Sequence, residues 1–247
     1  MGLLSKLKQD LPTDAKGEED RIGGGPQIRE SDAYPMTVKL AYLTVSSKGA
    51  NGLAIHAECE DSSEYRNTEW ITSGTAKGCK TYYEYQGEKR YLQGFINADA
   101  ICQVITGKGI LDQHEEERVV KLWNKDAKAE VPTPVAAIPD LIGKKFIAGI
   151  VKKRENKTVK DNNGNYVKTA ETREINELNK VFSEDGLTVT ELAAGQTEAS
   201  HINAWVDRFK DVVIDKVDKD AAPAPVQAAG GSAPATAGAS SLFGNRK

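Results

Sequence analysis

The sequence gathers aromatic and basic residues in one short window, residues 77–95. Aromatic faces stack on bases and cations follow phosphates when a protein binds single-stranded nucleic acid. We therefore predict that four tyrosines of the window, with Trp70, stack on bases and that its four cations contact phosphates. These residues are Tyr82, Tyr83, Tyr85 and Tyr91, with Lys77, Lys80, Lys89 and Arg90. Tyrosine is also common in strand cores, so burial of the aromatic residues is the competing interpretation.

A strand over residues 79–85 would display alternate residues on opposite faces. Tyr83 and Tyr85 would then share one face, and Lys80, Tyr82 and Glu84 would share the other. One of these faces should pack on the core, so we expect only part of the aromatic set to remain available for stacking.

Residues 143–168 form a second candidate contact, because they hold eight bases and two acids, a local charge of +6. The Asn163-Gly164 pair near the centre of this stretch is a strong hairpin signal. We predict a long basic hairpin whose strands begin near residues 146 and 166. Its candidate phosphate contacts are Lys145, Lys152, Lys153 and Arg154. The alternative is a solvated edge whose lysines protect it from aggregation.

Motifs of the common catalytic and metal sites are absent from the sequence. Its three histidines and three cysteines lack zinc-ligand spacing. The glycines of residues 74–80 have the wrong spacing for a P-loop, and no Gly-x-Ser-x-Gly or dinucleotide-binding pattern occurs. We therefore predict no catalytic residue, no metal and no cofactor, and we do not expect an enzyme.

Composition favours a soluble protein of one or two domains. The 247 residues carry a formal net charge of −3, and their mean hydropathy is −0.51. No apolar run approaches the roughly 20 residues of a membrane span, and no secretory signal is recognisable. We expect the cytoplasm, with the cysteines as free thiols.

Hydrophobic periodicity predicts a mainly β, α+β body over residues 34–215, with five or six strands. Alternation places Met36, Val38, Leu40 and Tyr42 on one face of a strand over residues 36–45. A turn at residues 47–52 joins it to a second strand at 53–59, as in a hairpin. Further strands are expected at 66–73, at 79–85 and in the basic hairpin.

Helical spacing of apolar residues predicts two helices. The first covers residues 95–106, and Gly107 is suited to end it. The second covers residues 198–213, with Ile202, Trp205, Val206, Phe209, Val212 and Val213 on one face. Residues 114–123 fit a helix or a strand equally well.

The regions outside this body are predicted to be unstructured. Residues 1–33 are predicted to be a flexible arm, and residues 216–240 an Ala/Pro/Gly-rich linker that cannot bury a core. The chain then ends in a tip, residues 241–247, which regains bulky apolar side chains and cations.

Three features together resemble a known family. They are the strand-rich first half, the helix Ala-Ile-Cys-Gln-Val-Ile-Thr-Gly at 100–107, and the strand that is entered through Leu-Ile-Gly-Lys-Lys-Phe at 141–146. Over residues 34–185 the chain is similar to bacteriophage single-stranded-DNA-binding proteins of the podovirus type. The resemblance implies an OB-fold, here a five-stranded barrel, that coats single strands during DNA replication and recombination in the host cytoplasm.

Members of this family commonly end in a flexible tail that contacts replication or transcription proteins. Many such tails are acidic, whereas this one is not, so competition with DNA by charge is not expected. We predict instead that the tip docks on a partner such as a polymerase and contributes to transcription regulation. Its candidate contacts are Leu242, Phe243, Arg246 and Lys247.

Two alternatives remain open at this point. One is a virion structural or assembly protein without nucleic-acid affinity, whose tyrosines lie in the core. The other is a regulator that acts mainly through protein contact at residues 241–247. A homo-oligomer is also conceivable, since an exposed strand edge can pair between chains.

Overall fold

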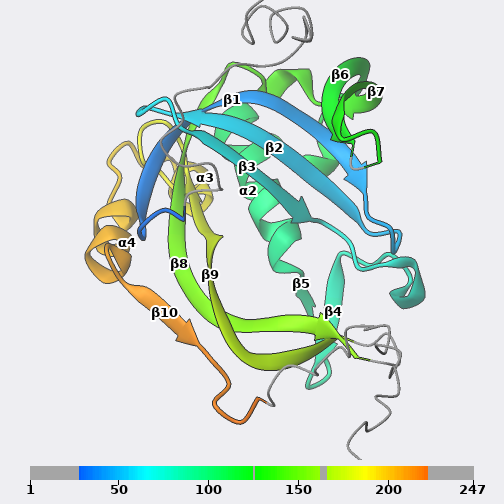
Figure 1. Ribbon diagram of the computed structural model, residues 1–247. Helices are drawn as coiled ribbons and strands as arrows, with labels where there is room; N and C mark the ends of the chain where they lie inside the picture. Colours follow the sequence, from blue (N-terminus) through cyan, green and yellow to red (C-terminus); the bar gives the residue numbers. More distant parts are fainter. Residues whose placement is uncertain (1–27, 125, 162–165, 222–247) are drawn as a thin grey trace, which may run out of the picture.

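The computed structural model describes residues 28–124, 126–161 and 166–221 (Figure 1). The fold is mainly β, as predicted. Its strands are β1 Asp32–Val45, β2 Asn51–Cys59, β3 Glu64–Trp70, β4 Tyr82–Tyr85, β5 Glu88–Tyr91, β6 Glu116–Asn124, β7 Ala129–Ala137, β8 Lys145–Lys160, β9 Tyr166–Phe182 and β10 Val213–Lys216. Its helices are α2 Gln93–Thr106, α3 Val189–Ala193 and α4 His201–Phe209, with short 3-10 turns η1 Thr75–Lys77, η2 Ile110–Asp112 and η3 Pro139–Leu141.

The prediction of five or six strands was too low, because the described residues form ten. Eight of them belong to one large sheet, and β4 and β5 form a separate two-stranded ribbon. The main sheet contains the order β3-β2-β1-β8, with β9 paired to β8. All of these pairings are antiparallel, and only β10 runs parallel to its neighbour β8. Figure 1 shows β8 and β9 sweeping round from this sheet so that the whole curves about α2.

The predicted hairpin of β1 and β2 is confirmed, but β1 does not keep one apolar face. Its register with β2 shifts between Val38 and Leu40, which marks a β-bulge at the intervening residue. A bulge exchanges the two faces of a strand beyond it. Met36 and Val38 therefore lie in the main core, whereas Leu40 and Tyr42 belong to a smaller apolar cluster. The prediction that all four share a face was wrong for this reason.

Helix α2 confirms the helix predicted at 95–106, and Gly107 ends it at a φ of 74°. The helix packs Ala98, Ile101 and Cys102 into the main core. It also lies in the gap between β3 and β9, which are not paired with each other in the described residues. Asn97 crosses this gap, since its amide donates to the carbonyl of Leu178 at 2.9 Å and to Glu69 Oε2 at 3.2 Å.

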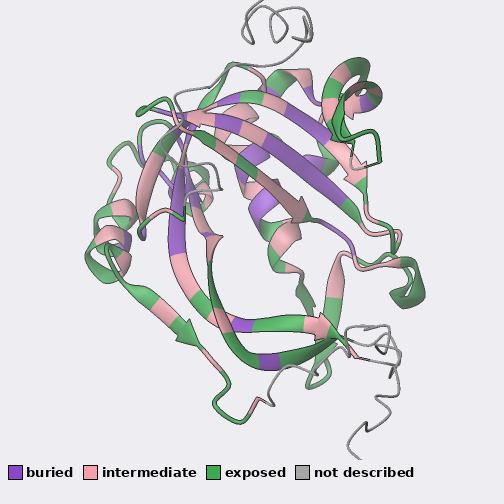
Figure 2. Cartoon of the chain, viewed as in Figure 1, coloured by how far each residue is buried: buried purple, intermediate pink, exposed green. Residues whose placement is uncertain are grey.

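Residues 114–123, which fit either element, form most of strand β6. The β6–β7 hairpin is anchored by Val120, Leu122 and Val135, which pack against Tyr42 and Ala54. Figure 2 shows that little else of this hairpin is buried. The second apolar cluster thus attaches the hairpin to the face of β1 and β2 opposite the main core.

The predicted terminal helix is shorter than expected. Trp205 anchors α4, because it is buried and its indole N–H donates to Asn179 Oδ1 at 2.8 Å. The helix ends at Phe209, since the chain turns at Asp211 (φ 58°), whose N–H donates to the carbonyl of Ser31. Val212 and Val213 therefore leave the apolar face and are exposed.

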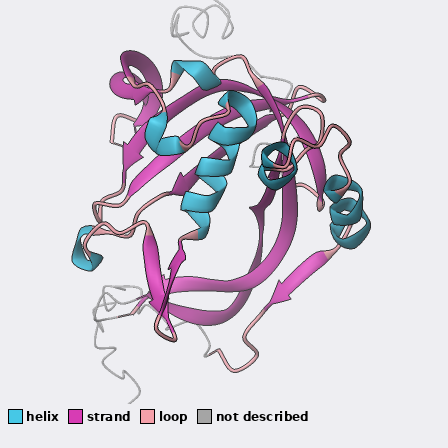
Figure 3. Ribbon diagram, turned by 180° about the vertical axis from the view of Figure 1, so that it is seen from behind, coloured by secondary structure: helices cyan, strands magenta, loops and turns pink. Residues whose placement is uncertain are grey.

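The ends of the fold extend slightly beyond the predicted body. Ser31 is fully buried, and β1 begins at Asp32, inside the stretch predicted as a flexible arm. Most of that arm, and the tip residues predicted to bind a partner, lie outside the described residues. Cys59, Cys79 and Cys102 are free thiols, as predicted. No helix among the described residues is long and apolar enough to cross a membrane. Figure 3 shows the helices of the fold from the opposite side.

Candidate nucleic-acid interface

The β4–β5 ribbon presents the predicted aromatic window to solvent. Tyr83, Tyr85 and Tyr91 are 47%, 50% and 58% exposed, and Tyr82 is partly buried. Tyr82 pairs with Tyr91 and Tyr83 pairs with Arg90, so each face of the ribbon carries aromatic side chains. The expectation that one face packs on the core was wrong, because this ribbon stands apart from the main sheet. The competing interpretation of the tyrosines as core residues is contradicted by their exposure.

Cations lie close to the tyrosine rings of the ribbon. The ammonium groups of Lys80 and Lys89 are 5.5 and 5.0 Å from the centroid of the Tyr82 ring. The Arg90 guanidinium lies 5.1 Å from that of Tyr85. Such contacts are attractive because the ring face is electron-rich. Tyr91 instead stacks on Phe95 with a centroid distance of 4.9 Å, which covers one of its faces.

A groove connects the ribbon to Trp70. Trp70, 41% exposed, lines a hollow of about 930 Å³ together with Lys48 and Lys77. A smaller hollow of about 270 Å³ is lined by Lys80, Tyr82 and Tyr83. The two hollows share Ser73, Lys77 and Leu92 as lining residues, so they are adjoining parts of one surface. We call this surface, with the β4–β5 ribbon, the aromatic groove.

Close contact between two loops positions the lysines of the groove. The N–H of Thr75 donates to the carbonyl of Lys48 at 2.9 Å. Gly49 has a φ of +74°, and a Cβ there would lie 2.0 Å from Thr75 Oγ1. A Cβ on Gly74 would lie 2.7 Å from the Lys48 carbonyl. Glycine at 49 and 74 thus allows the β1–β2 turn and η1 to bring Lys48 and Lys77 to one groove.

The far end of the β8–β9 hairpin approaches the same turn. The ammonium groups of Lys48 and Lys160 lie 5.6 and 5.5 Å from the centroid of the Tyr166 ring, which is 61% exposed. Sequence reasoning did not select Lys48. Its position in the turn between the first two strands was the only available signal, and that signal does not distinguish it from other turn lysines.

The other predicted phosphate contacts are placed differently. Lys145 forms an ion pair with Glu184 at 3.0 Å. Lys152 lies 2.9 and 3.2 Å from Glu30 and Glu174, and its hydrogen bonds to both raise its pKa.

Lys153 pairs with Glu177 at 3.0 Å and Glu155 at 3.6 Å, and the hydrogen bond to Glu177 is the main cause of its raised pKa. Arg154 is exposed and has no carboxylate partner among the described residues.

The structure does not bring these four residues to the aromatic groove. Lys145 is the partner of Thr37 in the sheet, whereas the groove begins beyond Val45 at the other end of β1. Within the described part of the chain, Lys48, Lys77, Lys80 and Lys89 form no ion pair, while Arg90 is paired with Glu88 at 2.9 Å. Four unpaired lysines therefore gather around the groove, whereas Arg154 is the one unpaired cation among the four predicted contacts of β8 in the described chain.

Comparison of the chain with known protein families gave no match, and none was found among curated proteins or solved structures. The resemblance to phage single-stranded-DNA-binding proteins therefore remains a prediction from residues and motifs.

Proposed function

We propose that this protein binds single-stranded DNA along the aromatic groove without dependence on base sequence. The observation that carries the proposal is the exposure of Trp70, Tyr83 and Tyr85 beside lysines that have no carboxylate partner in the described chain. Exposed aromatic side chains and free cations in one groove provide stacking surfaces for bases and counter-charges for phosphates. Stacking accepts any base, because every base has a π face.

The contacts divide the aromatic residues into two roles. Trp70, Tyr83 and Tyr85 are the proposed stacking residues. Tyr82 holds Lys80 and Lys89 near its ring, so its proposed role is to position these cations for phosphates. Tyr91 can offer one face only, because Phe95 covers the other.

The order of the strands supports an OB-fold as the scaffold. We assign β1, β2, β3, β8 and β9 as its five strands, with α2 between the third and the fourth. The β4–β5 and β6–β7 hairpins are then insertions on either side of this helix. OB-folds bind oligonucleotides on the face of their second and third strands and with the loops after strands one and four. Lys48 lies in the first of these loops, and Lys160 and Tyr166 flank the second.

We further propose that the protein serves phage DNA replication and recombination, as the family resemblance implies. In this proposal the tip residues Leu242, Phe243, Arg246 and Lys247 contact a replication or transcription protein such as a polymerase. Deletion of residues 241–247 should then abolish the partner interaction and leave affinity for DNA unchanged.

Fluorescence anisotropy with labelled oligo-dT, and with a duplex of equal length, tests the DNA-binding proposal. We expect single-strand binding that weakens with salt and little binding to the duplex. The logarithm of the binding constant falls linearly with the logarithm of the salt concentration, and each phosphate contact contributes about 0.7 to the steepness of this slope on single strands. Replacing both Lys77 and Lys80 with alanine should therefore make the slope shallower by roughly 1.4. Lys145→Ala is the matched control, because this lysine is already paired with Glu184, and it should leave the slope unchanged.

The Trp70→Ala variant tests stacking in the same assay. We expect a loss of about 1–3 kcal/mol of binding free energy, the usual contribution of one stacked base. Absence of binding by the unmodified protein at low salt would refute the proposal. It would favour the alternative of a virion structural or assembly protein without nucleic-acid affinity.

A further inference from the structure

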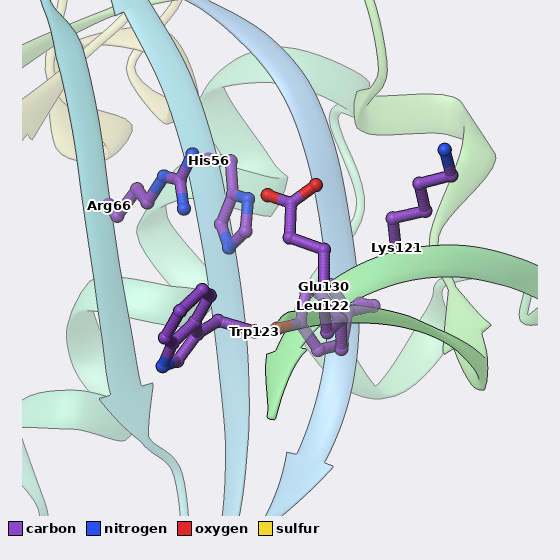
Figure 4. Close-up of a pocket in the computed structure, with 7 residues that line it drawn as sticks. His56, Arg66, Lys121, Leu122, Trp123 and Glu130 are labelled. Carbon is purple, nitrogen blue, oxygen red and sulfur yellow. The ribbon is translucent and has the colours of Figure 1, made fainter. Parts of the chain in front are cut away.

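A second hollow, of about 270 Å³, lies between strands β1 to β3 and the β6–β7 hairpin. Strands β1, β2 and β3 contribute Tyr42, His56 and Arg66, and the hairpin contributes Lys121, Leu122, Trp123 and Glu130. Figure 4 shows His56, Arg66 and Glu130 directed toward one space, with the Trp123 indole at its edge and Lys121 pointing away. Trp123 and Glu130 are directly opposite each other in the hairpin, so they project from the same face.

Three polar groups meet in this hollow without partners. The His56 ring nitrogens, the Trp123 indole N–H and the Glu130 carboxylate form no hydrogen bond or ion pair with any described residue. The His56 ring meets the Tyr42 ring in an edge-to-face arrangement, at a centroid distance of 5.8 Å. Burial, and next the charge of Arg66, lowers the pKa of His56, so its ring is neutral at pH 7 and can both donate and accept. Trp123 is 63% exposed although it is large and aromatic.

This hollow is on the same face of the sheet as Trp70. Trp70 and Arg66 are four residues apart on β3, and alternate residues of a strand share a face. The register pairs Trp70 with Gly52 and Arg66 with His56, two positions of β2 that also share a face. A Cβ on Gly52 would meet the Trp70 ring and the Thr68 methyl, which confirms that both lie over that side. Because four residues of a strand span roughly 13 Å, Arg66 and Trp70 are separated by about this distance along β3.

We propose that this hollow receives one base of the bound strand, and that the preferred base carries an exocyclic amino group. The proposal rests on the proposed function, because it requires the strand bound in the aromatic groove to continue along β3 toward Arg66. Trp123 provides a stacking face for the base. The Arg66 guanidinium, on β3, is ion-paired with Glu64 at 2.9 Å and offers a second planar surface in the hollow.

Glu130 supplies the preference among bases. A carboxylate accepts hydrogen bonds and cannot donate them when ionised. The amino group of cytosine, adenine or guanine satisfies it, whereas the corresponding carbonyl of thymine would be repelled. Stacking along the aromatic groove stays independent of sequence, so the preference is confined to one nucleotide position.

The test uses the full chain and labelled oligo-dT in which a single dC is moved through successive positions. At one position we expect the dC oligonucleotide to bind about tenfold more tightly than oligo-dT, the least effect usual for a hydrogen bond to a charged group. Glu130→Gln should remove this difference, because an amide can also donate to the thymine carbonyl. Trp123→Ala should weaken binding of all the oligonucleotides by at least about fivefold, as loss of one stacked base does.

Val119→Ala is the matched control, because Val119 is exposed on the same strand and does not line the hollow. It should leave affinity and base preference unchanged. If oligo-dT binds and Trp70→Ala weakens it, but neither the dC scan nor Trp123→Ala has an effect, the base pocket is refuted and the proposed function stands. If no oligonucleotide binds, both proposals fail.

Discussion

The side-chain carboxyl group of Glu69 should oppose folding when it is ionised. It lies on β3 beside α2, where Asn67 donates to its Oε1 at 2.7 Å and Asn97 donates to its Oε2 at 3.2 Å. Burial raises its pKa from 4.5 to about 7, and the charge of Glu177 adds to the rise, although both asparagine bonds lower it. We predict that Glu69→Gln stabilises the protein above neutral pH, because Gln resembles the neutral acid.

The sign and size of the effect of Glu69 on stability follow from the linkage between proton binding and folding. Between pH 4.5 and about 7 the unfolded chain has lost the Glu69 proton and the folded chain retains it, so stability falls as pH rises. Each pH unit in this window costs about 1.4 kcal/mol, which gives roughly 3 kcal/mol in total. His56 opposes this trend, since its lowered pKa makes folding more favourable as pH rises through 6.5. Only the difference between wild type and variant therefore isolates Glu69.

Urea unfolding followed by tryptophan fluorescence, at pH 5 and pH 8, measures this difference. The free energy of unfolding of Glu69→Gln, relative to that of wild type, should rise by about 2.5 kcal/mol from pH 5 to pH 8. The altered hydrogen bonds shift this difference equally at both pH values, so they do not affect the rise. Glu64→Gln is the matched control, because Glu64 is on the same strand and is exposed, and it should show little growth. A constant difference for Glu69→Gln would refute a neutral, buried carboxyl at this position.

Two further predictions follow from burial and exposure. Trp205→Ala should reduce the free energy of unfolding by about 3–5 kcal/mol in urea, because it empties a core position that is 4% exposed. A thiol reagent should modify Cys79 quickly and leave Cys59 and Cys102 protected in the folded protein, as mass spectrometry of digests would reveal. Bound oligo-dT should slow this reaction, since Cys79 adjoins Lys80 and contacts the Gly49 carbonyl; equal rates with and without oligo-dT would count against the aromatic groove.

Local patterns were sufficient to predict the elements that are regular over their whole length. The β1–β2 hairpin and α2 follow from alternation and helical spacing, and the Gly107 end follows from its tolerance of positive φ. The face exchange in β1 was not predictable, because the bulge between Val38 and Leu40 leaves an unbroken run of alternating residues. The end of α4 depends on a hydrogen bond from Asp211 to Ser31, which is distant in sequence.

The aromatic window was predictable as a set of residues but not as a surface. Whether Tyr83 and Tyr85 are buried depends on what packs on the strand, and no local pattern carries that information. The structure leaves the β4–β5 ribbon unpacked on the main sheet, so more of the set is available than alternation implied. The hollow at Trp123 was missed because its walls come from strands far apart in sequence.

The basic stretch at 143–168 shows why charge counted along a chain can mislead. Strand β9 brings acidic residues of the next segment alongside β8, and Lys153 and Lys157 pair with Glu177 and Glu171. The excess of positive charge in the sequence is therefore largely cancelled across the hairpin. A polyanion responds to the field at the surface, in which paired charges contribute little beyond their immediate neighbourhood. The unpaired lysines of the aromatic groove are fewer, but they have no carboxylate to displace before they can meet a phosphate, and for this reason we place the DNA there.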